Sequence, residues 1–153
     1  MKGRAGLLGI TVALLGGILQ AAEPTPVDAM LTEYFTIQTS LAKDTTSNVA
    51  VSAAKIVELS AKVPAKAPAT KTALDGVRKA AAAIKGADLK TARNHFGELS
   101  KGMTAYLQAA YPGQKKANQY YCPMVKKGWL QPDKGVRNPY YGSSMLKCGE
   151  LVN

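Results

Sequence analysis

The segment LKTARNHFGELSKGMTAYLQAA, residues 89–110, decides the fold because its apolar residues recur at steps of three and four. The stripe consists of Leu89, Ala92, Phe96, Leu99, Met103, Tyr106 and Ala110. This spacing places one apolar stripe on one face of a helix about 30 Å long. Asp88 can cap the start of this helix, and Pro112-Gly113 ends it.

Three earlier segments carry the same apolar rhythm, and each predicts another amphipathic helix. Their stripes are Val27, Met30, Tyr34, Ile37 and Leu41; Val49, Ala53, Ile56, Leu59 and Val63; and Leu74, Val77, Ala81 and Ile84. The connections between these segments are short, which favours antiparallel neighbours. The sequence therefore predicts an all-α protein, an up-and-down four-helix bundle over residues 23–113.

The composition fits one exported domain. The chain has 153 residues, 46% hydrophobic and 20% charged, which is enough to bury one core. Lys2 and Arg4 precede an apolar run and the small residues Ala21 and Ala22, the layout of a secretory signal peptide over residues 1–22. The run is short for a membrane span, so after cleavage we expect no span and a periplasmic or secreted protein. Cleavage would lower the formal net charge from +10 to +8.

Residues 114–153 lose the helical rhythm and gain glycine, proline and paired tyrosines. Disordered tails are poor in aromatic residues, so we expect an irregular lobe packed on the bundle within one domain. Both cysteines lie in this lobe, each near a methionine: Cys122 with Met124, and Met145 with Cys148. An extended strand would point Cys122 and Met124 the same way, and a helical turn would do so for Met145 and Cys148.

Two interpretations of the cysteines stay open. Thiolates and thioethers are soft ligands that favour Cu(I) and similar ions. His95, the single histidine, lies on the predicted fourth helix and could complete such a site. The candidate metal ligands are therefore His95, Cys122, Met124, Met145 and Cys148. Alternatively, an oxidising compartment favours a Cys122–Cys148 disulfide, a purely structural or interaction role, and no metal.

The sequence gives little support for nucleic-acid binding or for catalysis. The lysines are spread thinly, and no run of basic residues interleaved with aromatics indicates nucleic-acid binding. No phosphate loop, zinc-finger spacing or paired-carboxylate motif appears. A cysteine nucleophile would need a positioned base, and His95 lies far along the chain from either cysteine. We therefore predict no catalytic residues and no enzymatic activity.

Several motifs together resemble a known domain family. They are His95-Phe96-x-x-Leu99-Ser100, Tyr121-Cys122-Pro123-Met124, Gly128-x-Leu130, Asn138-Pro139-Tyr140-Tyr141-Gly142 and Met145-Leu146-x-Cys148-Gly149. The chain from about Val27 onward resembles a helical domain of unassigned function. That domain occurs alone in secreted bacterial proteins and at the C-terminus of periplasmic adaptor subunits of copper/silver efflux pumps of the RND type.

The resemblance implies periplasmic handling of Cu(I), with Ag(I) as a surrogate, and maps the family's motif residues onto the five candidate ligands. The chain lacks the barrel-sandwich and hairpin regions that an adaptor needs to bridge pump components. We therefore expect a stand-alone copper-binding accessory protein whose partner is a copper efflux or copper-handling protein. The expected partners include no nucleic acid.

Overall fold

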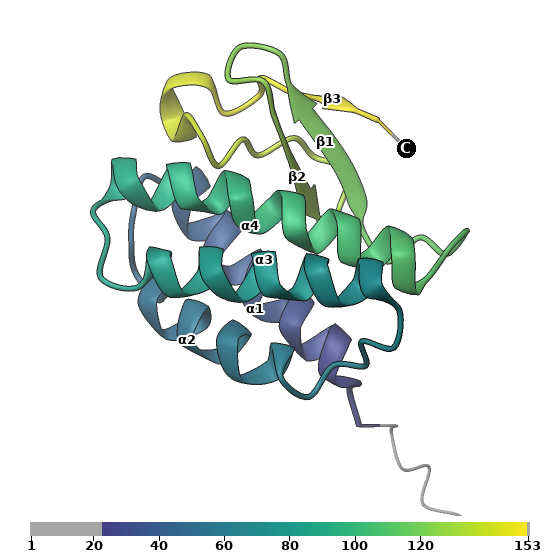
Figure 1. The fold of residues 1–153 in the computed structure, drawn as a ribbon. Helices are drawn as coiled ribbons and strands as arrows, with labels where there is room; N and C mark the ends of the chain where they lie inside the picture. The colour runs from purple at the N-terminus through teal and green to yellow at the C-terminus, as the bar shows by residue number, and fades with distance from the viewer. Residues whose placement is uncertain (1–22, 153) are drawn as a thin grey trace, which may run out of the picture.

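The computed structural model describes residues 23–152, so the expected signal peptide lies outside the described residues. Within that range the chain forms four helices, followed by short strands and one 3-10 turn (Figure 1). The elements are α1 (Pro26–Ala42), α2 (Val49–Ser60), α3 (Pro68–Ile84), α4 (Leu89–Ala110), β1 (Asn118–Cys122), β2 (Lys127–Gln131), η1 (Gly142–Met145) and β3 (Glu150–Leu151).

The helix ends follow from local side-chain chemistry. The Thr25 hydroxyl accepts a hydrogen bond from the Asp28 N–H at 3.2 Å and caps α1. Asp88 caps α4 in the same way, accepting from the Thr91 N–H at 2.8 Å. After α3, Gly86 adopts φ +78°, a conformation that glycine reaches without steric cost. The cap predicted at Asp88 is therefore confirmed.

The helices pack in chain order: α1 contacts α2, α2 contacts α3, α3 contacts α4, and α4 also contacts α1. Figure 1 shows α3 and α4 running alongside each other over the other two helices. The central members of the predicted stripes are at most 1% exposed: Tyr34, Ile37, Leu41, Ala53, Ile56, Leu74, Val77, Ile84, Phe96, Leu99, Met103 and Tyr106. Each large apolar side chain buried in this way stabilises the fold by about 1.5–3 kcal/mol.

The protein is mostly helical, as expected, but it is not purely all-α, and its lobe is not wholly irregular. Residues 118–151 contain a three-stranded antiparallel sheet in the order β2-β1-β3. Tyr120 lies opposite Trp129, and their rings stack with centroids 5.4 Å apart. Such cross-strand aromatic pairs stabilise short strands. Strands of two to five residues are too short to show a clear alternating pattern, which is why periodicity alone did not reveal them.

A buried polar contact attaches the sheet to the bundle. The Tyr34 hydroxyl on α1 accepts a hydrogen bond from the Leu130 N–H of β2 at 3.0 Å. The same hydroxyl shares a 2.6 Å hydrogen bond with Ser100 Oγ on α4. Burial raises the pKa of Tyr34, so the hydroxyl stays neutral and its hydrogen bonds persist. One tyrosine therefore joins α1, α4 and β2 at the base of the lobe.

A second contact ties the lobe to the C-terminal end of α1. The Arg93 guanidinium on α4 donates to Pro139 O at 2.9 Å, to Leu41 O at 2.8 Å and to Asp44 Oδ1 at 2.6 Å. The other carboxylate oxygen of Asp44 accepts from the Ser143 N–H at 2.9 Å. We call Asp44, Arg93 and Ser143 the lobe clasp, since they connect the α1–α2 loop, α4 and η1.

The clasp predicts a pH dependence of stability. The Ser143 and Arg93 hydrogen bonds lower the pKa of Asp44 to about 2 from an ordinary 3.8. Its stabilising contribution is therefore complete above the unfolded pKa and is lost as pH falls through the folded pKa. We expect the difference in unfolding free energy between the native protein and Asp44→Asn to shrink as pH falls from about 4 to 2.

Urea unfolding followed by the fluorescence of Trp129, the single tryptophan, measures this difference. Asp75→Asn is the matched control, because it removes a carboxylate from the exposed face of α3. The contrary result is a difference in unfolding free energy between the native protein and Asp44→Asn that stays constant over that pH range. That result would show that the clasp does not hold the carboxylate in its charged form.

Candidate functional site

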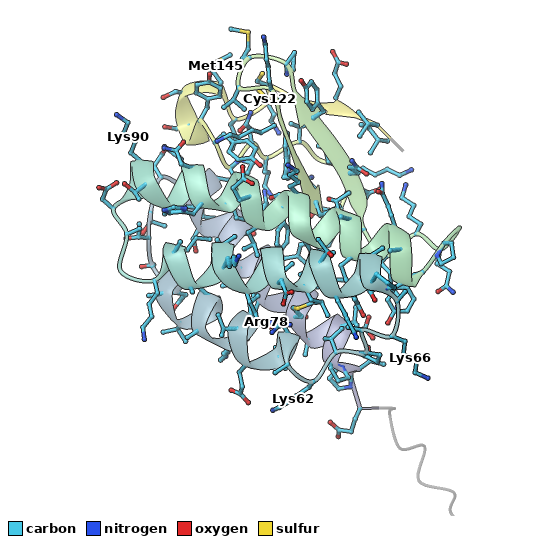
Figure 2. All side chains as sticks on the ribbon, in the orientation of Figure 1. Lys62, Lys66, Arg78, Lys90, Cys122 and Met145 are labelled. Carbon is cyan, nitrogen blue, oxygen red and sulfur yellow. The ribbon has the colours of Figure 1, made fainter. Side chains whose placement is uncertain are left out.

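The two cysteines lie in contact inside the lobe. Cys122 is the last residue of β1 and is fully buried, whereas Cys148 is half-buried just before β3. Their sulfur atoms are 3.1 Å apart, although the residues are separated by 26 positions. Both are free thiols. The fold therefore builds one dithiol from two distant segments, in the part of the lobe above α4 where Figure 2 labels Cys122.

The sulfur–sulfur distance lies between two chemical states. A disulfide needs about 2.05 Å, so the atoms would have to approach by about 1 Å. Two thiolates that hold one metal ion at about 2.3 Å with a tetrahedral angle lie about 3.8 Å apart. That arrangement needs an opening of about 0.7 Å. Small side-chain movements therefore connect the dithiol with either state.

The surroundings favour negative charge on Cys122. Burial by itself would raise the pKa of this thiol, but its hydrogen bond with Cys148 lowers it. Hydrogen bonds from the backbone N–H groups of Val125 and Met124 lower it further, as does the Asn138 side chain. The pKa of Cys122 therefore lies below its ordinary value. The hydrogen bond to Cys122 raises the pKa of Cys148, so Cys122 is the more acidic of the two thiols.

Asn138 holds the segment that carries Cys148. Its side chain is fully buried, and its Nδ2 donates to Cys148 O at 2.7 Å. Its Oδ1 accepts from the Tyr140 N–H at 2.8 Å and the Tyr141 N–H at 3.3 Å, and its own N–H donates to Leu146 O. In the sequence, Asn138 stood out only as part of the Asn138-Pro139-Tyr140-Tyr141-Gly142 motif. One sequence signal could have indicated this larger role: asparagine side chains often form a hydrogen bond with the backbone two residues further along the chain.

Met124 does not lie in one extended strand with Cys122, contrary to the predicted backbone geometry. Strand β1 ends at Cys122, and residues 123–126 form the turn to β2. The Met124 side chain is 62% exposed, while its backbone N–H supports the Cys122 sulfur. The expected helical turn is present at the second pair, because the Cys148 N–H donates to Met145 O at 3.0 Å. Met145 ends η1 and is half-buried.

His95 is half-buried on α4, next to Phe96, whose ring packs on Tyr140 of the lobe. Over residues 23–152, no three His, Cys, Asp or Glu side chains gather into a group that could hold a metal ion. His95 therefore does not complete such a group with Cys122 and Cys148. A shared role for His95, Met124 and Met145 with the dithiol stays a prediction.

A family model described as "Protein of unknown function (DUF3347)" matches residues 30–115, more than half of the chain. The chain belongs to this family. The DUF3347 match includes His95 and the four helices apart from the start of α1, and it ends before both cysteines. Searches of curated proteins and of solved structures find no match to the chain. Among the described residues, no helix has the length and apolar character needed to cross a membrane.

Proposed function

We propose that this protein is a non-enzymatic copper-handling accessory protein of the periplasm or extracellular space. It binds Cu(I) through Cys122 and Cys148. The observation that carries the proposal is the dithiol itself: two free thiols 3.1 Å apart, one of them with a pKa below its ordinary value. The resemblance of the lobe motifs to a domain of copper/silver efflux adaptors supports the choice of metal. The copper ion is cargo that the protein receives and hands on to a copper efflux or copper-handling partner.

The chemistry of the donors supports a soft monovalent ion. Sulfur ligands favour Cu(I) and Ag(I) over hard oxygen-seeking cations. Structural zinc sites use four protein ligands, commonly cysteine and histidine. The described residues offer two cysteines without a third His, Cys, Asp or Glu in their group. Met145, three residues before Cys148, and Met124, exposed on the β1–β2 turn, are the thioethers available to add a weaker ligand.

The hydrogen bonds around Cys122 would keep that sulfur in place while Cys148 moves. Two backbone N–H groups and the Asn138 amide hold the Cys122 sulfur, and groups of this kind orient metal ligands. Cys148 lies on the segment between η1 and β3 and is partly open to solvent. Entry of the ion would therefore displace the thiol protons and open the pair, while Cys122 stays fixed.

The test is a titration of the fully reduced protein with Cu(I) against a coloured chelator that competes for the ion. We expect one Cu(I) per chain. Removal of a group that merely supports a metal ligand typically lowers affinity by about 10–100-fold. The Cys122→Ser/Cys148→Ser variant removes both proposed ligands, so its affinity for Cu(I) should fall by at least that factor. Met103→Leu is the control, since it removes a buried core sulfur of α4 and leaves the lobe unchanged. One-to-one binding that survives in the double cysteine variant would contradict the proposal.

The same sulfur contact favours a second candidate, a Cys122–Cys148 disulfide in a structural or interaction module. Closing a loop of about 26 residues stabilises a fold by roughly 3–4 kcal/mol. Thiol counting and metal analysis on protein taken from its own compartment separate the two candidates. Two reactive thiols after denaturation, with bound copper, support metal handling. No free thiols and no copper support the disulfide.

A further inference from the structure

A groove runs between α4 and one face of the β1–β2 hairpin. It consists of two adjoining open hollows of about 590 and 470 Å³ that share Thr104, Gln108 and Gln119. Gly128 lines the hairpin side of the groove and has no side chain to fill it. It pairs with Tyr121 across the sheet. At Gly97 of α4, the methylene chain of Lys127 packs directly against the helix backbone. The groove is thus formed where the hairpin crosses α4 (Figure 1).

The charges along this groove are almost all positive. Its acidic lining residue is Glu98, whereas its basic lining residues are Lys101, Lys115, Lys116, Lys126 and Lys127. Lys116 is compensated by Asp28 at 3.3 Å, and Lys127 lies over the Tyr140 ring at 5.7 Å. Lys101 and Lys126 are exposed and have no ion-pair partner among residues 23–152. The groove therefore presents uncompensated positive charge from both of its walls.

We propose that this groove binds an acidic, extended segment of a partner protein. Along α4 it reaches from Gly97 to Tyr111, about 20 Å at 1.5 Å per residue. That length matches about six residues of extended chain. Carboxylates near the two ends of such a segment would meet the lysines, and neutral residues between them would meet Thr104, Gln108 and Leu107.

The lining favours a polypeptide over a single-stranded nucleic acid. Nucleic-acid grooves combine a basic track with a series of aromatic rings on which successive bases stack. Here Tyr121 is 38% exposed, while Tyr111 is covered by Lys116 at 5.0 Å from its ring. The middle of the groove offers hydroxyl and amide groups, which pair with a peptide backbone.

The groove and the dithiol share strand β1 and the turn that follows it. Tyr121 directly precedes Cys122, and Lys126 lies in the turn whose N–H groups support the Cys122 sulfur. Because neighbouring residues of a strand point to opposite faces of its sheet, a partner docked against Tyr121 would lie across the hairpin from the Cys122 sulfur. The inference goes beyond the proposed function and stands without it, because none of the groove residues is a candidate metal ligand.

The test uses a fluorescent ten-residue peptide of alternating glutamate and alanine, with a lysine–alanine peptide as the opposite-charge control. We expect saturable binding of the acidic peptide by anisotropy, with amide shifts mapping to α4 and β1. Lys101→Glu/Lys126→Glu should weaken binding by at least about tenfold, since two attractive charges become repulsive. Lys66→Glu/Lys90→Glu is the matched control, with the same change in net charge at exposed positions away from the groove (Figure 2).

Several results would overturn the proposal: no binding, equal weakening by both double variants, or shifts that map elsewhere. Tighter binding at the groove by a single-stranded oligonucleotide of equal charge would replace the peptide by a nucleic acid. The Cys122→Ser/Cys148→Ser variant is measured in parallel and should bind the peptide as the native protein does. This arm separates failure of the groove proposal from failure of the copper proposal.

Discussion

Asn138→Ala is expected to lower the free energy of unfolding by about 3 kcal/mol. The substitution leaves the Tyr140 N–H, the Tyr141 N–H and Cys148 O without their side-chain partner inside the lobe. Each buried polar group that loses its partner costs about 1–3 kcal/mol, with the weaker Tyr141 contact at the low end. Urea unfolding followed by Trp129 fluorescence measures the loss.

Two further variants make this result specific. Asn94→Ala removes an exposed asparagine from α4 and should change stability by less than about 0.5 kcal/mol. Asn138→Asp keeps the acceptor for Tyr140 and Tyr141 but cannot donate to Cys148 O. Asn138→Asp should therefore not recover the lost stability, because a buried carboxylate oxygen would face Cys148 O. A native-like unfolding midpoint for Asn138→Ala would show that the lobe does not depend on this side chain.

Gly142→Ala is expected to cost about 2–4 kcal/mol, because two penalties act at one position. Gly142 has φ +56°, where an L-residue pays about 1–2 kcal/mol. An added Cβ would also overlap the Asp44 carboxylate and the Arg93 guanidinium. The lobe clasp must then open or shift. Differential scanning calorimetry on the native protein and the variant measures the total effect.

Gly113→Ala separates the two penalties, since Gly113 has φ +75° and an added Cβ there meets nothing within 4 Å. Gly113→Ala should therefore show only the free-energy cost of the left-handed backbone conformation. Combining Gly142→Ala with Asp44→Ala should cost less than the sum of the two single changes, because the overlapping carboxylate is gone. Strict additivity would mean that the Cβ does not act through the clasp.

The bundle could be predicted because its signals are local. Thr25, Asp88 and Gly86 mark helix ends, and the apolar stripes repeat over several turns. Val63 shows where this reasoning fails. It fits the stripe of the second helix, but α2 ends at Ser60, and Val63 is buried from the following loop. A buried apolar residue fits the spacing of a helix whether or not the backbone stays helical.

The lobe could not be predicted to the same depth because its contacts are long-range. Periodicity has too few residues in β1 and β2 to identify a strand, and nothing local sets the pairing of Tyr121 with Glu150. The sequence indicated that Cys122 and Cys148 share a lobe. It did not indicate that Asn138 joins them, since that role depends on three backbone groups brought together by folding.

The distance in sequence between the partners that attach the lobe has a consequence for the order of folding. Neighbouring helices meet over short loops, whereas the Gln38–Arg137, Tyr34–Leu130 and Asp44–Ser143 hydrogen bonds span 99, 96 and 99 positions. Contacts between nearby residues form early, and contacts that close long loops form late. We therefore expect α1–α4 to assemble first and the hairpin to dock afterwards. The amide protons of β1 should then exchange with solvent through an opening that leaves the helices protected.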